Sequence, residues 1–142
     1  MLNDIILKKI EQMSILLQEL QELVSIPFPE FKSTFKNIRS AERNFQLIIE
    51  LASDINAQII ADLGARIPDT YKESFKRMSE LKIINEKSLP DFLKSSNLRN
   101  ILIHEYDFDE DNFIFYKSAK EFIPLYEEYI QSIQKHLKIK VK

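Results

Sequence analysis

The chain has 142 residues, of which 44% are hydrophobic and 30% are charged, and its formal net charge is −2. This length and composition suffice for an apolar core, so we expect residues 1–142 to form a single domain. With Gly64 as the single glycine, all-β folds and phosphate-binding glycine loops are excluded. The absence of cysteine excludes disulfide frameworks, thiolate zinc sites and cysteine nucleophiles. The composition therefore favours an all-α fold.

The charge balance and the first residues limit the partners and the location that the chain suggests. Because the chain has 20 basic and 22 acidic residues, its overall charge attracts neither nucleic acid nor an anionic membrane. RNA binding would therefore need a local patch of basic residues. The start of the chain lacks the blocks of a signal peptide, and no apolar run is as long as a membrane span. We therefore expect a soluble cytoplasmic protein without a membrane partner.

Apolar residues at helical spacing predict two long helices in the first half of the chain. The first covers about residues 4–24, and Pro27 and Pro29 prevent its continuation. Its expected core-facing residues are Ile6, Ile10, Met13, Leu17, Leu20 and Val24, widened by Ile5, Leu16 and Leu23. The second helix begins near residues 33–37, with Ser33 or Asn37 as its cap. Its apolar residues that hold the same core-facing period are Ile38, Ala41, Phe45, Ile48, Ile49, Ala52, Ile55, Ile59 and Leu63. Gly64 then lies where helix ends favour left-handed backbone.

Shorter patterns predict three more helices after Gly64. Thr70–Glu73 fits a capping box and opens the third helix, whose inner side carries Phe75, Met78 and Leu81. The fourth starts at Ser88–Asp91 and turns Phe92, Leu98, Ile101 and Leu102 inward. After a polar turn at Asp107–Asp111, a fifth helix contains Pro124, which predicts a kink or a break. Its inward residues are Phe113, Tyr116, Ala119, Phe122, Ile123, Tyr126, Tyr129, Ile130, Ile133 and Leu137.

Together these elements predict an antiparallel bundle of four to five helices with short connections. The heptad spacing of the first helix would also suit packing against a partner chain. Both interpretations remain open at this point.

Polar residues near the end of the predicted fourth helix form the main functional pattern. On a helical wheel Arg99 and Tyr106 share one line, and Asn100 and His104 share another. Ile103 falls between these lines, and an apolar residue in a polar, exposed face indicates that a second chain covers it. Arg99 and His104 would converge through the long arginine side chain, a helix end, or pairing across a two-fold axis.

This segment resembles the R-x-x-x-x-H-x-Y signature of the HEPN superfamily, with Arg99, His104 and Tyr106 at the defined places. More narrowly, it resembles the HepT-like toxins encoded beside minimal nucleotidyltransferase antitoxins, in which a polar residue such as Asn100 follows the arginine. The likeness covers nearly the whole chain. Other segments in the family's order are Ala41–Gln46 leading into Glu50 and Asp54, Pro68–Phe75 with Tyr71 and Ser74, and the helix containing Leu125 after an acidic turn.

The resemblance implies a HEPN-like helical fold and a metal-independent endoribonuclease toxin of a type II toxin–antitoxin system. It also implies a homodimer with the active site at its interface, an RNA substrate (tRNA and mRNA are candidates), no cofactor and no metal. Arg99, Asn100 and His104 would be the catalytic residues. Histidine, with an ordinary pKa of about 6.5, can take the proton of a 2′-hydroxyl or supply one to the leaving oxygen. Arginine can bind phosphate oxygens in a fork, and Asn100 could hold the imidazole or donate to phosphate.

Tyr106 has two interpretations. As a structural residue it would pack with Arg99 and stack on a base. The resemblance implies instead that the partner nucleotidyltransferase antitoxin attaches AMP to Tyr106. The added bulk and negative charge beside Arg99 would then compete with RNA phosphate.

A second function class uses the same fold without catalysis: a helical module that binds a nucleotidyltransferase partner or a nucleotide. The presence of Arg99, Asn100, His104 and Tyr106 together argues against it, because a structural module does not require all four. Cleavage of RNA by the purified chain in the presence of a chelator would separate the two hypotheses.

The remaining candidate residues have simpler explanations. His136 is expected at a solvated helix end, and Glu50 and Asp54 are expected to pair with basic residues or to orient the motif helix. The Asp107–Asp111 segment is not a calcium loop, because Asn112 and Ser118 occupy the required glycine and glutamate positions. Candidate phosphate contacts are Lys87, Lys94 and the tail lysines Lys135, Lys138, Lys140 and Lys142, although a tail of this kind is more often a frayed, solubilising end.

Overall fold

The structure, a computed structural model, describes the backbone of residues 2–104 and 108–141 and the side chains of residues 2–100 and 112–138. Its elements are α1 (Leu2–Ser25), α2 (Phe28–Ser33), α3 (Phe35–Asp62), α4 (Tyr71–Glu80), the 3-10 turn η1 (Glu86–Ser88), α5 (Leu89–His104) and α6 (Phe108–Val141). No strand occurs within these ranges, so the predicted all-α class is confirmed. Within the same ranges, no helix combines the length and the apolarity that crossing a bilayer requires.

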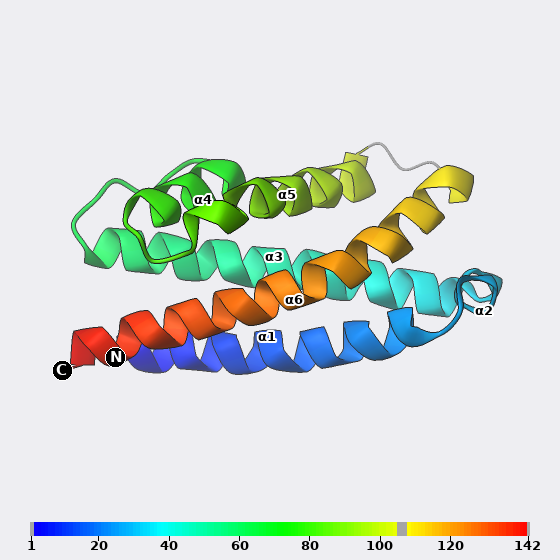
Figure 1. Ribbon diagram of the computed structural model, residues 1–142, viewed down its shortest axis with the longest axis horizontal. Helices are drawn as coiled ribbons and strands as arrows, with labels where there is room; N and C mark the ends of the chain where they lie inside the picture. Colours follow the sequence, from blue (N-terminus) through cyan, green and yellow to red (C-terminus); the bar gives the residue numbers. More distant parts are fainter. Residues whose placement is uncertain (1, 105–107, 142) are drawn as a thin grey trace.

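The long helices α1, α3, α5 and α6 lie side by side and alternate in direction, as Figure 1 shows. The chain therefore runs up and down the bundle, and its two ends meet at the same end of the molecule (Figure 1). The short helix α4 packs against α5 at that end (Figure 1). Short connections force neighbouring helices to be antiparallel, which confirms the predicted bundle.

Helical periodicity predicted most of the core correctly. The whole stripe from Ile6 to Val24 is buried, with Ile6 and Met13 fully inaccessible. Three predicted core residues are wrong: Ile5 is 50% exposed, Leu63 is 47% exposed and Leu81 is 38% exposed. Leu63 and Leu81 are the C-cap residues of α3 and α4, so they lie past the last helical turn that packs on the core.

Phe113 is a fourth misplaced core residue. It is 50% exposed, although its ring packs edge-on against Phe28 with 5.0 Å between the ring centroids. The other predicted inward residues of α6, from Tyr116 to Leu137, are all buried. Ile101 and Leu102, predicted to face inward, belong to α5, but their side chains lie outside the described residues.

The starts of α4 and α3 show that local sequence patterns predicted one N-cap correctly and the other wrongly. Thr70 is the N-cap of α4, and its hydroxyl accepts a hydrogen bond from the backbone N–H of Glu73 at 3.1 Å, as predicted. At α3, however, the N-cap is Thr34 rather than Ser33 or Asn37. Ser33 is unavailable because it ends α2 and donates its hydroxyl to the carbonyl of Glu30 at 2.6 Å.

Left-handed backbone ends both α3 and α4. Gly64 has a φ of 81°, and the N–H of Ala65 bonds to the carbonyl of Ile60, which confirms the predicted glycine terminator. Lys82 adopts the same conformation after α4, with a φ of 61°, and the following N–H of Ile83 bonds to the carbonyl of Met78. A side chain at positive φ is strained, so Lys82 ends its helix less favourably than Gly64 does.

The second half of the chain departs from the predicted boundaries at α6. This helix begins at Phe108, so the polar turn predicted for residues 107–111 is wrong over 108–111, while Asp107 lies outside the described residues. Pro124 lies inside α6 without breaking it, and Figure 1 shows the helix axis bending near its middle. Buried Tyr126 and Tyr129 keep the second half of α6 packed despite the missing backbone donor.

A buried aromatic cluster joins α5 to its neighbours. The rings of Phe75 on α4 and Phe92 on α5 are stacked with 4.9 Å between centroids, and both pack against Tyr126 on α6. The Tyr126 hydroxyl lies 2.7 Å from Ser95 Oγ on α5. Burial raises the pKa of the Tyr126 phenol well above its ordinary value, so the hydroxyl stays neutral. These contacts fix the amino-terminal part of α5.

A buried polar chain continues from this cluster into α3. The Tyr129 hydroxyl donates to Asn56 Oδ1 at 2.6 Å, and Asn56 Nδ2 donates to Ser74 Oγ at 3.1 Å. Burial, reinforced by the neighbouring Tyr126, also raises the pKa of Tyr129. These hydrogen bonds therefore hold α3, α4 and α6 in register around the amino-terminal part of α5.

Candidate functional site

Arg99 on α5 is the predicted site residue that the structure describes most fully. Its side chain is only 17% exposed, and Nη2 lies 3.2 Å from Oε1 of Glu50 on α3. The pair joins two helices across 49 positions of sequence. A guanidinium this far removed from solvent requires a partner of opposite charge, which Glu50 supplies.

Two further groups contact the Arg99 guanidinium. Its central carbon lies 4.7 Å from the ring centroid of Tyr71, the first residue of α4, in a cation–π arrangement. Its Nη1 donates to Oδ1 of Asn100 at 3.4 Å. The buried Nε has no acceptor among the described residues. Side chains of α3, α4 and α5 thus converge on one guanidinium.

Asn100 is exposed and lies at the edge of a hollow between α5 and the start of α4. The hollow has a volume of about 500 Å³, and it is lined by Asp69, Thr70, Tyr71, Lys72, Ser96 and Asn100. Most of these side chains are polar. The position of Asn100 therefore leaves its amide accessible to a ligand while its oxygen accepts from Arg99.

The other two motif residues fall at or beyond the end of α5. His104 is the last residue of this helix, and its side chain lies outside the described residues, as does that of Ile103. Tyr106 lies outside them altogether. The predicted meeting of Arg99 with His104, and the role of Ile103 in an interface, therefore stay predictions.

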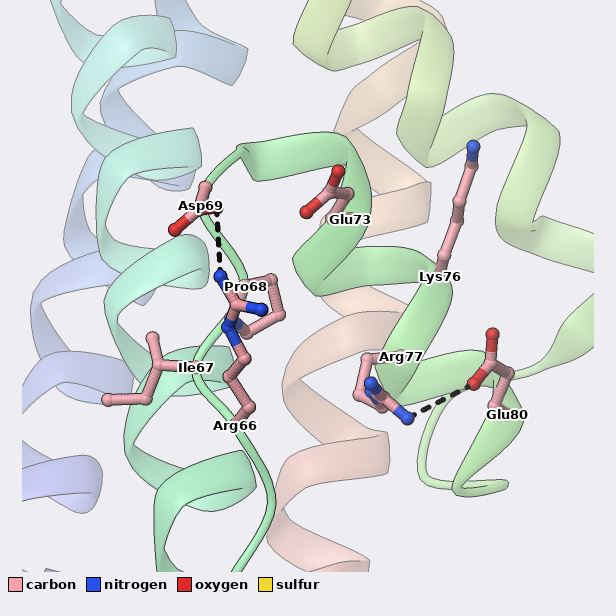
Figure 2. A pocket seen from close by; sticks show the side chains of 8 residues that line it. All are labelled: Arg66, Ile67, Pro68, Asp69, Glu73, Lys76, Arg77 and Glu80. Carbon is pink, nitrogen blue, oxygen red and sulfur yellow. Dashed lines mark ion pairs between the residues drawn. The ribbon is translucent and has the colours of Figure 1, made fainter.

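A second hollow, shown in Figure 2, lies along α4 and the segment that precedes it. Its volume is about 370 Å³, and its lining includes three basic side chains (Arg66, Lys76 and Arg77) and three acidic ones (Asp69, Glu73 and Glu80). Arg66 pairs with Asp69 at 3.6 Å and Arg77 with Glu80 at 3.5 Å, as the dashed lines in Figure 2 mark. Because the charges balance, this hollow does not attract phosphate as a basic patch would.

Glu50 and Asp54 behave as the sequence predicted. Glu50 pairs with Arg99, and Asp54 Oδ2 lies 3.6 Å from Lys9 Nζ on α1. Both carboxylates therefore have cationic partners on other helices. Within the described part of the chain, no group of three histidine, aspartate or glutamate side chains is arranged to hold a metal ion.

The prediction for His136 is wrong. Helix α6 continues to Val141, so His136 is not in its last turn, and its side chain is half-buried beside Leu63, Leu81 and Ser132. Burial lowers the pKa of His136, which disfavours the cation expected at a solvated helix end.

The lysines predicted to contact phosphate do not form a described site with Arg99. Lys87, Lys94, Lys135 and Lys138 are exposed, while the side chains of Lys140 and Lys142 lie outside the described residues. Lys94 lines a separate hollow between α5 and α6, and Lys135 lines the one beside His136. The tail is helical up to Val141.

Tyr71 is the site residue that sequence reasoning missed. Tyr71 belongs to the capping box and to the family's order of segments, and neither pattern indicates a contact with a residue of α5. Its aromatic ring at a helix start was the one available hint. The contact with Arg99 arises because α4 packs against α5 through Phe75 and Phe92.

Comparisons with known proteins show which family and which relatives the chain resembles. A family described as "Ribonuclease HepT-like" matches residues 13–133. The chain is 32% identical over 130 residues to "tRNA nuclease HepT" of Aphanizomenon flos-aquae, covering 90% of this chain and 88% of that protein. It is 28% identical over 105 residues to "mRNA nuclease HepT" of Shewanella oneidensis, covering 74% and 78% respectively.

A similar solved structure is that of the tri-AMPylated HEPN toxin of Shewanella oneidensis in complex with MNT antitoxin. It matches with a TM-score of 0.83 and 25% sequence identity, covering 93% of this chain and 98% of that one. The likeness thus extends over nearly the whole chain.

Proposed function

This chain belongs to the HepT-like ribonuclease family, and from that premise we propose that it is a metal-independent endoribonuclease toxin of a type II toxin–antitoxin system. The observation that carries the proposal is the position of Arg99, the arginine of the R-x-x-x-x-H-x-Y segment. Its side chain is 17% exposed, and side chains of three helices contact its guanidinium. An arginine in such a fixed pose is suited to bind a phosphate oxygen at a reacting centre.

The proposed reaction is attack of the RNA 2′-hydroxyl oxygen on the adjacent phosphorus. A histidine takes the 2′-hydroxyl proton, the bond from phosphorus to the 5′-oxygen breaks, and a second proton donor protonates that oxygen. The products are a 2′,3′-cyclic phosphate and a 5′-hydroxyl end. His104 would act as the base or the acid, and Arg99 would stabilise the charge that builds on the phosphate. DNA lacks the attacking hydroxyl and would not be cut.

A homodimer would complete this site. Two copies of His104 across a two-fold axis could divide the roles of base and acid, and Ile103 would be covered by the partner subunit. Asn100 would hold the imidazole or donate to the phosphate.

Neutralisation would be covalent. A minimal nucleotidyltransferase antitoxin would transfer AMP to the hydroxyl of Tyr106, placing negative charge and bulk near Arg99. The related toxin of Shewanella oneidensis is AMPylated and bound to MNT antitoxin, which supports this part of the proposal. The added phosphate would compete with RNA for the same cation.

The proposed substrate is cellular RNA in the cytoplasm. The two relatives are named a tRNA nuclease and an mRNA nuclease, so both RNA classes belong in the first test. The near-neutral charge of the chain means that binding would depend on a few local cations.

The test uses purified chain whose intact mass shows no attached AMP. It is incubated with total tRNA, or with a defined mRNA, in the presence of EDTA, and cleavage is followed by gel. We expect cleavage with cyclic phosphate ends and its loss in Arg99→Ala and in His104→Ala. No cleavage of either RNA by unmodified dimeric protein would favour the non-catalytic binding module instead. Coexpression with the nucleotidyltransferase should add AMP to the wild type and not to Tyr106→Phe.

A further inference from the structure

Only some of the N–H groups of the Arg99 guanidinium have hydrogen-bond acceptors among the described residues. A guanidinium carries five N–H groups, two on each terminal nitrogen and one on Nε. Glu50 engages one N–H of Nη2, and Asn100 engages one N–H of Nη1. One N–H on each terminal nitrogen is therefore without an acceptor among the described residues. The Nε N–H also lacks an acceptor there, so three donors of the guanidinium remain for phosphate oxygens.

Glu50 and Tyr71 restrict how this guanidinium can move. Glu50 fixes one edge of it through a charged hydrogen bond of 3.2 Å, and the Tyr71 ring covers it at 4.7 Å from the centroid. A free arginine side chain samples many rotamers, and each contact removes some of them. Neither residue belongs to α5, so α3 and α4 restrict the pose of Arg99 together with Asn100 of the motif helix.

We propose that Glu50 and Tyr71 are positioning residues, which hold the Arg99 guanidinium in the pose from which it meets the phosphate. The inference rests on the proposed ribonuclease function and adds two residues to it. Glu50 is not proposed as a base, because its carboxylate is paired with a cation whose charge the reaction uses. Tyr71 acts through its ring and not through its hydroxyl.

This role differs in its consequences from that of a structural ion pair. Without Glu50 the guanidinium keeps its charge, and local negative charge decreases, so RNA binds no more weakly. The guanidinium is, however, no longer held where charge develops in the transition state, so the chemical step slows. A positioning role therefore lowers kcat without raising KM. A purely structural role would change the melting temperature and leave both constants of the folded enzyme unchanged.

The experiment measures single-site cleavage of a defined tRNA by wild-type, Glu50→Gln and Tyr71→Leu dimers free of AMP. We expect Glu50→Gln to lower kcat about tenfold with KM unchanged or lower, because misplacing a catalytic group costs rate rather than binding. Tyr71→Leu should lower kcat by a smaller factor. Melting temperature and circular dichroism confirm that the compared proteins are folded.

Matched controls are available on the same helices. Asp54→Asn removes a carboxylate from α3 that pairs with Lys9, and it should retain wild-type kcat. Tyr71→Phe keeps the ring and removes the hydroxyl, so its kcat should exceed that of Tyr71→Leu. Glu50→Asp keeps the charge on a shorter side chain and should recover part of the rate lost in Glu50→Gln. If Glu50→Gln does not fold, Glu50→Asp and the two Tyr71 variants decide the question.

The outcomes separate this inference from the proposed function. If wild type cleaves and Arg99→Ala does not, the proposed function stands. Wild-type kcat and KM in Glu50→Gln and Tyr71→Leu would then overturn the positioning role alone. An increased kcat in Glu50→Gln would also overturn it, because Glu50 would then restrain Arg99 rather than position it. A wild type that cleaves no RNA overturns the function and, with it, this inference.

Discussion

Two regions of the molecule contain arginine–carboxylate pairs, and they differ in what holds the pairs together. Along α4, Arg66 and Arg77 pair with acidic residues three positions away, and their side chains are 85% and 44% exposed. At the carboxyl-terminal part of α5, Arg99 pairs with Glu50 of another helix and is 17% exposed. Pairs of the first kind join residues close in sequence, Arg66–Asp69 in the segment before α4 and Arg77–Glu80 along it, whereas the second requires three helices to pack correctly.

The comparison indicates which arginine can do chemistry. An exposed i,i+3 pair contributes little to stability, and solvent screens it, so nothing fixes the position of its guanidinium. A guanidinium removed from water and held by a carboxylate and a ring has a defined pose and a stronger local field. Arg66 and Arg77 therefore lie on solvated surface, and the region around Arg99 is the candidate phosphate site.

The largest expected difference between the two regions is in RNA cleavage. Arg99→Ala should lower kcat/KM about 10² to 10³-fold, because it removes a positioned charge at the reacting phosphate. Arg77→Ala, which removes an exposed arginine of the α4 hollow, should leave cleavage unchanged. The measurement is initial cleavage rate of a defined tRNA by unmodified protein. Equal losses in the two variants would contradict the distinction drawn here.

Stability should separate the same two regions. Glu50→Gln should lower the free energy of unfolding by about 1 kcal/mol, because it leaves a mostly buried guanidinium without its counter-charge. Glu80→Gln, the partner variant at Arg77, should cost less than about 0.5 kcal/mol, since that pair is exposed. Urea denaturation of both variants at neutral pH gives the comparison. A larger loss in Glu80→Gln would refute it.

The turns before and after α4 make a third test, in which stability changes and cleavage does not. Gly64→Ala should lower stability by about 1 kcal/mol, because a side chain at a φ of 81° is strained. No steric clash adds to this cost, since no neighbouring atom lies within 4 Å of the new methyl group. Lys82→Gly should raise stability by up to about 1 kcal/mol, since it relieves strain at a φ of 61°. Thermal denaturation detects both changes. Cleavage should be unaffected in both variants if α4 acts only through Tyr71.

The smallest expected effect concerns pH and separates the two histidines. Burial lowers the pKa of His136 in the folded protein below its ordinary value of 6.5, so the unfolded chain binds its proton more readily. Stability is therefore highest above that value and decreases slightly as pH falls below it. His136→Gln should remove this decrease while the acid limb of RNA cleavage persists. Disappearance of that limb in His136→Gln would mean that His136, and not His104, carries the titration of the reaction.

Structural features that depend on residues close in sequence were predicted correctly, whereas features that depend on contacts between distant elements were not. The stripe from Ile6 to Val24, the cap at Thr70 and the terminator at Gly64 depend on residues a few positions apart, and each is confirmed. Errors occurred where a local pattern meets another element. Leu63 and Leu81 fit the helical period but lie past the packed turns, and Ser33 was unavailable as a cap because an unforeseen short helix ends there.

The candidate site divides in the same way. The spacing of Arg99, Asn100 and His104 along one segment pointed to the ribonuclease family from the sequence, and the family match agrees. The sequence also limited Glu50 to pairing with a basic residue or orienting the motif helix. It did not identify which cation, and it gave no reason to connect Tyr71 with Arg99.

Periodicity and capping thus determined an all-helical chain and most of its buried faces, because these depend on one helix at a time, and the resemblance of one segment to a family signature identified the motif. Only the tertiary structure decided that a carboxylate of α3 and a ring of α4 meet the guanidinium of α5. The physical reason is that such contacts depend on the crossing and register of three packed helices, which side chains across the whole core determine together.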